Sequence, residues 1–185
     1  MGKLIYSMSV SLDGYVEDPS GSIGFTTPDE EVHRRANDQT RETSAFLFGR
    51  RLYEVMEEPW RALAARDDLP DVQAEFARIY LETPRFVFSN TLESVPEGVQ
   101  LVRSADSESV VRRLKEESEG FLGIGGPALA ASLFDLIDEF RLNVVPVIIG
   151  GGKPFFPPGR QVDLELVEEH RFPSGTVYLR YQRAG

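Results

Sequence analysis

The sequence predicts an α/β protein in three layers, with a mostly parallel central sheet, helices on both faces and an antiparallel hairpin at the C-terminal end. Short apolar runs alternate with helix-like segments along nearly the whole chain, an order typical of parallel strands joined by crossover helices. Residues 173–175 read Pro-Ser-Gly between the last two strand-like runs, which predicts a hairpin. The length of 185 residues suits a single domain over residues 1–185.

The expected strands are short apolar runs that end at Gly, Pro or polar turns. They comprise residues 3–10, 45–48, 85–88, 99–102, 121–124, 139–149, 162–172 and 176–183. Residues 11–28 are rich in Gly, Ser, Asp and Pro and are expected to form a loop.

Helices are expected after most of these strands. One opens near Thr27-Pro28-Asp29, where Asp29, Glu30 and Glu31 favour the positive end of the helix dipole. The remaining helices are expected to start at Arg50, to cover 70–82 with one apolar stripe, to cover 108–118 with Ser107 as N-cap, and to run from 127 to 134.

Composition and charge exclude several classes of function. The chain has no cysteine, and His33 and His170 lack ligand-like spacing, so no metal site is expected. A net charge of −10 disfavours nucleic acid as a partner. No signal-peptide pattern or membrane-spanning run is present, so a cytoplasmic location without a membrane partner is expected.

Ligands of open α/β sheets bind outside the carboxyl ends of the strands, which here points to residues 11–18, 49–53, 89–91 and 125–129. Gly125-Gly126-Pro127 follows a strand and opens a helix, where free N–H groups can hold a phosphate. A tight turn that simply needs glycine explains the motif equally well.

Gly49-Arg50-Arg51 also lies between a strand and a helix. Arginine forks grip phosphate oxygens in two-point geometry, whereas two solvated arginines are the commoner finding. Cations are unfavourable at a helix N-terminus, and an anion at that position would compensate for them.

Polar residues follow two further strands. Ser89, Asn90 and Thr91 can bind a ribose or its phosphate, although turn formation alone also explains them. Arg103 ends the next strand. If the sheet brings these residues together with Arg50 and Arg51, they form a ring around one phosphomonoester, which favours NADPH over NADH. Two catalytic motifs are absent: Pro154 follows Gly150-Gly151-Gly152-Lys153, which excludes a P-loop, and no Gly-x-Ser-x-Gly elbow occurs.

In these motifs the chain resembles the dihydrofolate reductase superfamily, and within it the branch of the C-terminal reductase domain of bacterial riboflavin biosynthesis and its stand-alone relatives. The resemblance runs from Leu4 to the C-terminus and rests on the order and spacing of short motifs. They are Ser11-Leu12-Asp13-Gly14-Tyr15, Gly49-Arg50-Arg51-Leu52-Tyr53-Glu54, Phe88-Ser89-Asn90-Thr91, Val102-Arg103-Ser104, Ile124-Gly125-Gly126-Pro127-Ala128-Leu129, and Val145-Pro146-Val147 leading into Gly150-Gly151-Gly152.

The resemblance implies a dihydrofolate reductase-like fold, homodimerisation and a role for each motif. Gly49, Arg50, Arg51 and Leu52 would hold the pyrophosphate and adenosine phosphate of the cofactor, and Ser89, Asn90 and Arg103 its ribose 2′-phosphate. Gly125, Gly126, Pro127, Ala128 and Leu129 would cradle the pyrophosphate and nicotinamide ribose, and the Asp13 loop would cover the nicotinamide and the substrate.

Two departures from the family pattern bear on function. Leu52 stands where relatives often have a threonine whose hydroxyl binds phosphate, so one hydrogen bond to the cofactor is missing. Dihydrofolate reductases place a carboxylate of the first helix against the pteridine, and Asp29, Glu30 and Glu31 are the candidates here. First-turn acids explain these three residues at least as well.

The expected function is an NADPH-dependent reductase that transfers hydride to a small heterocycle. The preferred substrate is a ribosylaminopyrimidine of the 5-amino-6-(5-phosphoribosylamino)uracil type; a dihydropteridine and a non-catalytic NADPH-binding role remain alternatives. Asp13 is the catalytic candidate, and shaping the turn at Gly14 is its equal alternative. The substrate is expected near 13–25, 53–60 and 147–156, with Tyr15, Glu30, Tyr53 and Trp60 as contacts. The aromatic residues there, including Phe155 and Phe156, could equally be core.

Overall fold

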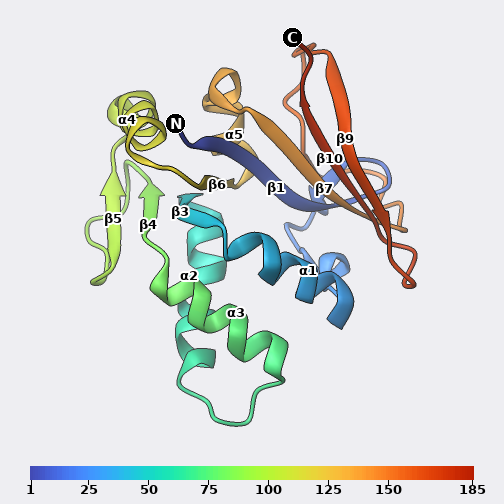
Figure 1. Ribbon diagram of the computed structural model, residues 1–185, viewed down its shortest axis with the longest axis horizontal. Helices are drawn as coiled ribbons and strands as arrows, with labels where there is room; N and C mark the ends of the chain where they lie inside the picture. The colour runs from blue at the N-terminus through green and yellow to red at the C-terminus, as the bar shows by residue number, and fades with distance from the viewer.

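The computed structural model describes residues 1–185 and is organised around one eight-stranded sheet in the order β5-β4-β3-β6-β1-β7-β10-β9 (Figure 1). All pairings from β5 to β7 are parallel, whereas β10 pairs antiparallel with β7 and with β9. The strands are β1 (Lys3–Ser11), β3 (Thr43–Gly49), β4 (Arg85–Phe88), β5 (Val99–Val102), β6 (Phe121–Gly125), β7 (Glu139–Val145), β9 (Leu164–Arg171) and β10 (Val177–Arg183). The predicted mostly parallel sheet with a C-terminal hairpin is confirmed.

Helices cover both faces of the sheet, which makes the three layers (Figure 1). One face carries α1 (Glu30–Thr40), α2 (Arg50–Ala64) and α3 (Asp71–Glu82), and the other carries α4 (Ser107–Glu117) and α5 (Pro127–Ser132). Single turns of 3-10 helix occur at Gly24–Thr26, Ser104–Asp106 and Phe134–Leu136. None of the helices combines the length and the apolar composition that crossing a bilayer requires.

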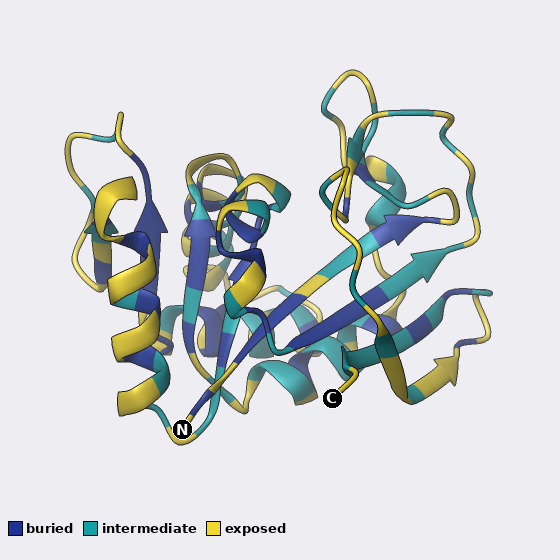
Figure 2. Ribbon diagram, turned by 90° about the horizontal axis from the view of Figure 1, so that it is seen from above, coloured by how far each residue is buried: buried dark blue, intermediate teal, exposed yellow.

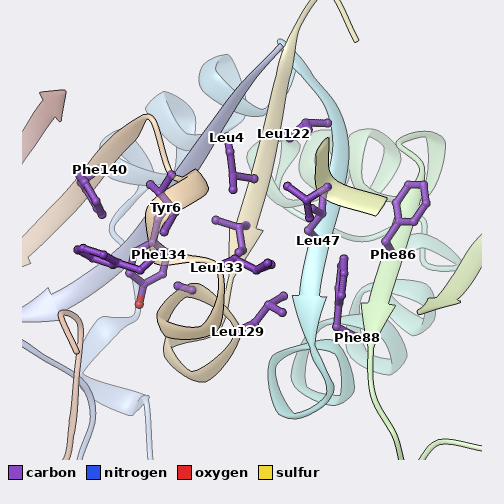
Figure 3. Close-up of a cluster of buried hydrophobic side chains, with 14 of the residues drawn as sticks. Leu4, Tyr6, Leu47, Phe86, Phe88, Leu122, Leu129, Leu133, Phe134 and Phe140 are labelled. Carbon is purple, nitrogen blue, oxygen red and sulfur yellow. The ribbon is translucent and has the colours of Figure 1, made fainter. Parts of the chain in front are cut away.

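The main apolar core lies between the sheet and the α4–α5 layer (Figure 3). Alternation along β1 sends Leu4 and Tyr6 into this core. The opposite face of the same strand presents Ile5, Ser7 and Ser9 to a cavity under the other helices. In Figure 2 the strands are largely buried while the outer faces of the helices are exposed. One face of the sheet is therefore filled with side chains, and the other keeps open space.

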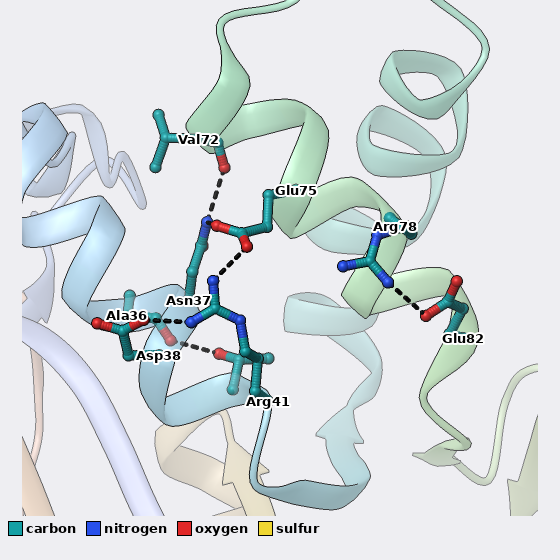
Figure 4. A network of polar contacts seen from close by, with 9 residues as sticks. Ala36, Asn37, Asp38, Arg41, Val72, Glu75, Arg78 and Glu82 are labelled. Atoms are coloured by element: carbon teal, nitrogen blue, oxygen red, sulfur yellow. Dashed lines mark hydrogen bonds and ion pairs between the residues drawn. The ribbon is translucent and has the colours of Figure 1, made fainter.

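The α1–α3 layer is held together by a polar network (Figure 4). The fully buried Asn37 of α1 donates from Nδ2 to the Val72 carbonyl at 2.8 Å and to Glu75 Oε2 at 3.0 Å. Glu75 also pairs with Arg41. Since an amide buried without partners is costly, these bonds fix the position of α1 over α3. Together α1 and α3 cover part of the sheet face that lies opposite the main core.

Several strand limits differ from expectation. β7 ends at Val145 and not at 149, because Pro146 lacks the N–H that a strand ladder needs. Residues 11–28 are not wholly loop: β2 (Tyr15–Glu17) pairs antiparallel with β8 (Lys153–Pro154) in a small second sheet. Neither strand is long enough to show a period of two in the sequence.

Helix ends also differ in detail. The first helix begins as expected, since Asp29 Oδ1 accepts the Val32 N–H at 2.9 Å and caps it. Ser107 does not act as an N-cap; it is the first residue of α4, and Asp106 occupies the cap position without a side-chain bond. α2 continues from Arg50 through Pro59 to Ala64.

Candidate functional site

Strand pairing brings the predicted motifs to one edge of the sheet. Gly49 at the end of β3 pairs with Phe88 of β4, and Phe48 pairs with Gly125 of β6. On the outer side, Phe88 pairs with Val102 of β5, so the residues after each strand are neighbours. The carboxyl ends of these strands thus meet as a parallel sheet requires.

A cavity of about 280 Å³ lies at this edge, and we call it the strand-end cavity. The starts of α2 and α5 line it with Gly49–Leu52 and Gly126–Leu129, and β2, β8 and the 21–23 loop close the opposite side. The structure therefore brings together eight of the expected cofactor contacts at one cavity, namely Gly49, Arg50, Arg51, Leu52, Gly126, Pro127, Ala128 and Leu129.

The two helix starts are in direct contact because of glycine. A Cβ on Gly125 would fall 2.5 Å from Leu52 Cδ2 and 3.2 Å from Phe48 Cδ1. Gly126 has a φ of +95°, a conformation that side-chain-bearing residues rarely adopt. A side chain on Gly125 would therefore displace the tip of Leu52 and press on Phe48, whereas Gly126 is required by the turn that opens the cavity.

Three cations, Arg50, Arg51 and Lys153, surround the strand-end cavity, and each of them has a carboxylate partner. Glu17 Oε1 lies 3.4 Å from Arg51 Nη1 and 3.4 Å from Lys153 Nζ. Arg51 also donates to the carbonyl of Gly21 at 3.3 Å, so it bridges the cavity. Arg50 pairs with Glu54 at 2.7 Å and reaches Thr91 Oγ1 at 2.5 Å, which links this cavity to the next turn. Arg50 and Arg51 are exposed, so these pairs are weak and can exchange for a phosphate.

The turn after β4 and Arg103 at the end of β5 lie beside the strand-end cavity, to which Arg50 links them through Thr91. Arg103 donates to the carbonyls of Ser89 and Leu92, both at 2.8 Å, and Asn90 Oδ1 accepts from Ser104 N at 2.9 Å. Ser89 Oγ accepts from two backbone N–H groups of its own turn, at Thr91 and Leu92. Ser89 is therefore largely used in shaping the turn, whereas Arg103 has no carboxylate partner, unlike most arginines of this chain.

A second cavity of about 300 Å³, the sheet-face cavity, lies between the sheet and the α1–α3 layer. Met8, Val16, Ile23 and Leu52 line both cavities, so the two adjoin. Most of its lining is apolar, and the polar contributors are Ser7, Ser9, Thr26, Gln39, Thr40, Thr43, Arg141 and Asn143. Arg141 is its only charged residue.

Asp13 lies outside both cavities. Its carboxylate is exposed and accepts from the N–H groups of Gly150 at 2.8 Å and Ile149 at 3.2 Å. A hydrogen bond from the Ser11 side chain, with those from Gly150 and Ile149, holds the pKa of Asp13 below its ordinary value. These contacts give Asp13 a turn-shaping position and keep it ionised at neutral pH.

The expected substrate contacts Tyr15, Glu30, Tyr53 and Trp60 line neither cavity. Tyr53 is 7% exposed in the core beside Phe48 and Tyr80, and Trp60 packs on Phe76 with ring centroids 4.5 Å apart. Glu30 pairs with Arg34 on the exposed first turn of α1. Tyr15 pairs with Pro154 in the small sheet. Amphipathic aromatics serve core and site alike, so sequence patterning does not separate these roles.

Phe155 and Phe156 also contribute to packing. Phe155 is 1% exposed and stacks on Tyr6 at 4.1 Å, and Phe156 contacts Phe155 edge-on. Val16, Ile23 and Met56 of the expected substrate regions 13–25 and 53–60 do line the sheet-face cavity. Lining residues that the sequence analysis did not single out include Met8, Phe46, Phe76, Arg141 and Asn143. Arg141 alone carried a signal, since an arginine inside an apolar strand run is unusual.

Comparison with known proteins agrees with this fold. The protein YyaP of Bacillus subtilis (strain 168), described as uncharacterized, is 26% identical over 186 residues, which cover 99% of this chain and 96% of YyaP. The crystal structure of a putative riboflavin biosynthesis protein from Shewanella sp. PV-4 aligns over 99% of both chains with a TM-score of 0.72 and 23% identity.

Dihydrofolate reductase from Enterococcus faecalis, complexed with NADP(H) and RAB-propyl, aligns over all of this chain and 98% of its own, with a TM-score of 0.63 and 16% identity. The predicted dihydrofolate reductase-like fold is therefore confirmed. The family model described as the RibD C-terminal domain matches residues 2–178. The chain belongs to the RibD C-terminal domain family.

Proposed function

We propose that this protein is an NADPH-dependent reductase that transfers hydride to a small heterocycle. The observation that carries the proposal is the strand-end cavity, where the start of the 15-residue helix α2 and three cations gather on a chain of net charge −10. A helix N-terminus offers unpaired N–H groups and partial positive charge, which suit a pyrophosphate.

The residues of this edge fit a phosphorylated dinucleotide. Gly49–Leu52 and Gly126–Leu129 would hold the pyrophosphate, and Arg50 and Arg51 would exchange their carboxylate partners for its oxygens. Arg103, with Asn90 beside it, is the cation free for a 2′-phosphate. When bound, the cofactor supplies the hydride, and the protein supplies orientation and the exclusion of water.

The adjoining sheet-face cavity is the proposed substrate site. Its apolar walls, with Phe46, Phe48 and Phe76 among them, suit a planar ring and keep water out. No carboxylate lines it, because Asp29 caps α1 and Glu30 pairs with Arg34. The pteridine alternative requires an acid there, so the lining favours the ribosylaminopyrimidine-type substrate.

The proposal is tested by titrating the purified protein with NADPH and following cofactor fluorescence, then by following NADPH absorbance with ribosylaminopyrimidines and dihydropteridines. We expect tight binding of NADPH and oxidation with the first substrate class. Binding without turnover on any substrate would favour the non-catalytic role, and absence of NADPH binding would reject the proposal.

We also propose that the protein forms a homodimer. The edge strand β9 exposes Leu166 and Val167, which supports association through this side. Sedimentation equilibrium should return twice the chain mass, and a monomer at all concentrations would contradict the proposal.

A further inference from the structure

Charged residues cross the α1 side of the sheet in one row. Strand register aligns Ser7 of β1 with Arg141 of β7, Arg141 with Arg180 of β10, and Arg180 with Glu168 of β9. Arg141 is 6% exposed, and Glu139, two residues before it, is 1% exposed. Charges buried to this degree are expensive unless they are paired or bind something.

Carboxylates satisfy only part of this cluster. Glu139 accepts from Arg141 Nε at 2.6 Å and from Arg180 at 2.8 and 2.9 Å. Glu168 pairs with Arg35 of α1 and lies 3.9 Å from Arg180. Three guanidinium groups thus share the carboxylates of Glu139 and Glu168.

The groups without a partner are donors. Nε is the only hydrogen-bonding atom of Arg141, so its Nη groups have no protein acceptor. Arg35 Nε and the Tyr178 hydroxyl are fully buried without a partner. The Arg35 guanidinium lies over the Tyr178 ring at 4.4 Å, so the two groups adjoin.

These donors line a third cavity of about 220 Å³, the arginine cavity, which Arg35, Arg141, Tyr178 and Arg180 surround. Gln39, Phe121 and Arg141 line it together with the sheet-face cavity, so the two adjoin. Of its acids, Glu168 is paired with Arg35, Asp38 is exposed and paired with Arg41, and Glu42 is exposed. The buried groups without a partner at this cavity are therefore hydrogen-bond donors, whereas the acids without an arginine of the row as partner are exposed.

We propose that the arginine cavity is an oxyanion subsite, in which Arg141, Arg35 and Tyr178 bind a phosphate or carboxylate group. Arginine forks and a hydroxyl match the lone pairs of such a group. Resting on the proposed function, the subsite takes the anionic tail of a substrate whose ring occupies the sheet-face cavity. Arg141 lines both cavities and would contact the substrate where its ring joins its anionic tail.

The test is an NMR titration of the full protein with inorganic phosphate and, separately, with acetate, observing the arginine Nε–H signals. We expect saturable shifts at Arg35 and Arg141, and the tighter of the two anions identifies the kind of tail. Tyr178→Phe removes one donor to a charged group and should weaken binding about tenfold. Since the Tyr178 hydroxyl has no partner in the protein, the variant should fold normally.

Tyr6→Phe is the matched control, because the Tyr6 hydroxyl is also buried without a partner but lies in the core on the opposite face of the sheet. It should leave both dissociation constants unchanged, as should Arg112→Ala at an exposed ion pair on α4. Arg141→Gln should abolish the shifts at Arg35. No shift with either anion, or equal affinity in Tyr178→Phe and the wild type, would overturn the inference.

NADPH binding separates this inference from the proposed function. Tyr178→Phe should bind NADPH as the wild type does. Saturable oxyanion shifts in a protein that fails to bind NADPH would retain the subsite and reject the reductase. Normal NADPH binding without oxyanion shifts would reject the subsite and leave the reductase proposal standing.

Discussion

Leu52 of α2 lies directly against Gly125 at the end of β6, so closely that a Cβ on Gly125 would come within 2.5 Å of Leu52 Cδ2. This contact joins the two helix starts that line the strand-end cavity. The family resemblance leads us to expect a phosphate-binding threonine here, and the contact with Gly125 gives the leucine a packing role instead. Leu52 therefore both packs against Gly125 and lines the cavity.

Gly125→Ala is therefore expected to destabilise the protein. The added methyl group also meets Phe48 at 3.2 Å, and overpacking of this kind costs about 1–3 kcal/mol. Urea unfolding measures the loss. In a Leu52→Thr background, which removes the Cδ atoms, the same change should cost clearly less, and equal costs in both backgrounds would show that Leu52 is not the obstacle.

Leu52→Thr alone is expected to strengthen NADPH binding. The threonine hydroxyl would lie on the first turn of α2 and add one hydrogen bond to a charged phosphate, an effect of about tenfold. Fluorescence titration measures the affinity. Leu52→Val has the shape of threonine without the hydroxyl and is the control. A gain of the same size in Leu52→Val would assign the effect to cavity space.

Arg103→Ala is expected to weaken NADPH more than NADH, by about tenfold, because Arg103 is the free cation beside Asn90. Arg51→Ala should affect both cofactors alike, since Arg51 spans the cavity between Glu17 and Gly21. Arg112→Ala, at an exposed pair on α4, is the control and should change neither. Titration with both cofactors measures the ratio, and an unchanged ratio in Arg103→Ala would remove the assigned 2′-phosphate contact.

The sequence allowed the sheet and one cavity to be predicted, because parallel strands end in short glycine and arginine motifs whose position follows from topology. Phe48 and Gly125 are far apart in the sequence, and both lie at the carboxyl ends of parallel strands; that β3 and β6 are adjacent follows from the strand order that the structure shows. The sheet-face cavity was not predictable in the same way. Its lining comes from alternate residues of several strands, such as Ser7 and Arg141, and only register shows that they share a face.

The substrate contacts were expected largely from aromatic residues, and the structure places none of the four expected contacts in the lining of either cavity. Tyr53 and Trp60 lie in the helix layer with Tyr80 and Phe76, where an apolar ring serves packing as readily as stacking on a ligand. Arg141 was a clearer sign of a site than the aromatic residues, because an arginine is rarely buried within a strand unless it is paired. The sequence does not show which residues those partners are.

Asp13→Asn is expected to leave the pH profile of kcat unchanged. The carboxylate accepts backbone N–H bonds from Gly150 and Ile149, and its lowered pKa keeps it ionised, so it has no proton to donate at neutral pH. Asparagine keeps one acceptor oxygen and should retain the turn. Steady-state rates across the neutral range measure this, and a lost or shifted ionisation in the variant would make Asp13 the proton-transfer residue.

Glu139→Gln is expected to destabilise the protein strongly near neutral pH and much less in acid. Burial opposes ionisation of Glu139, but hydrogen bonds from Arg180 and Arg141 outweigh it and hold the pKa of the carboxyl below its usual value. A lowered folded-state pKa gives stability that is present above the unfolded-state pKa and is lost as the pH falls through the folded-state value. Removing one partner of a buried ion pair costs about 3–5 kcal/mol.

Urea unfolding at about pH 7 and about pH 3.5 should therefore show a large difference from wild type at the first pH and a smaller one at the second. Glu108→Gln, at an exposed pair with Arg112, is the control and should differ little at either pH. A difference for Glu139→Gln that is constant with pH would show that the carboxylate charge does not stabilise the arginine row.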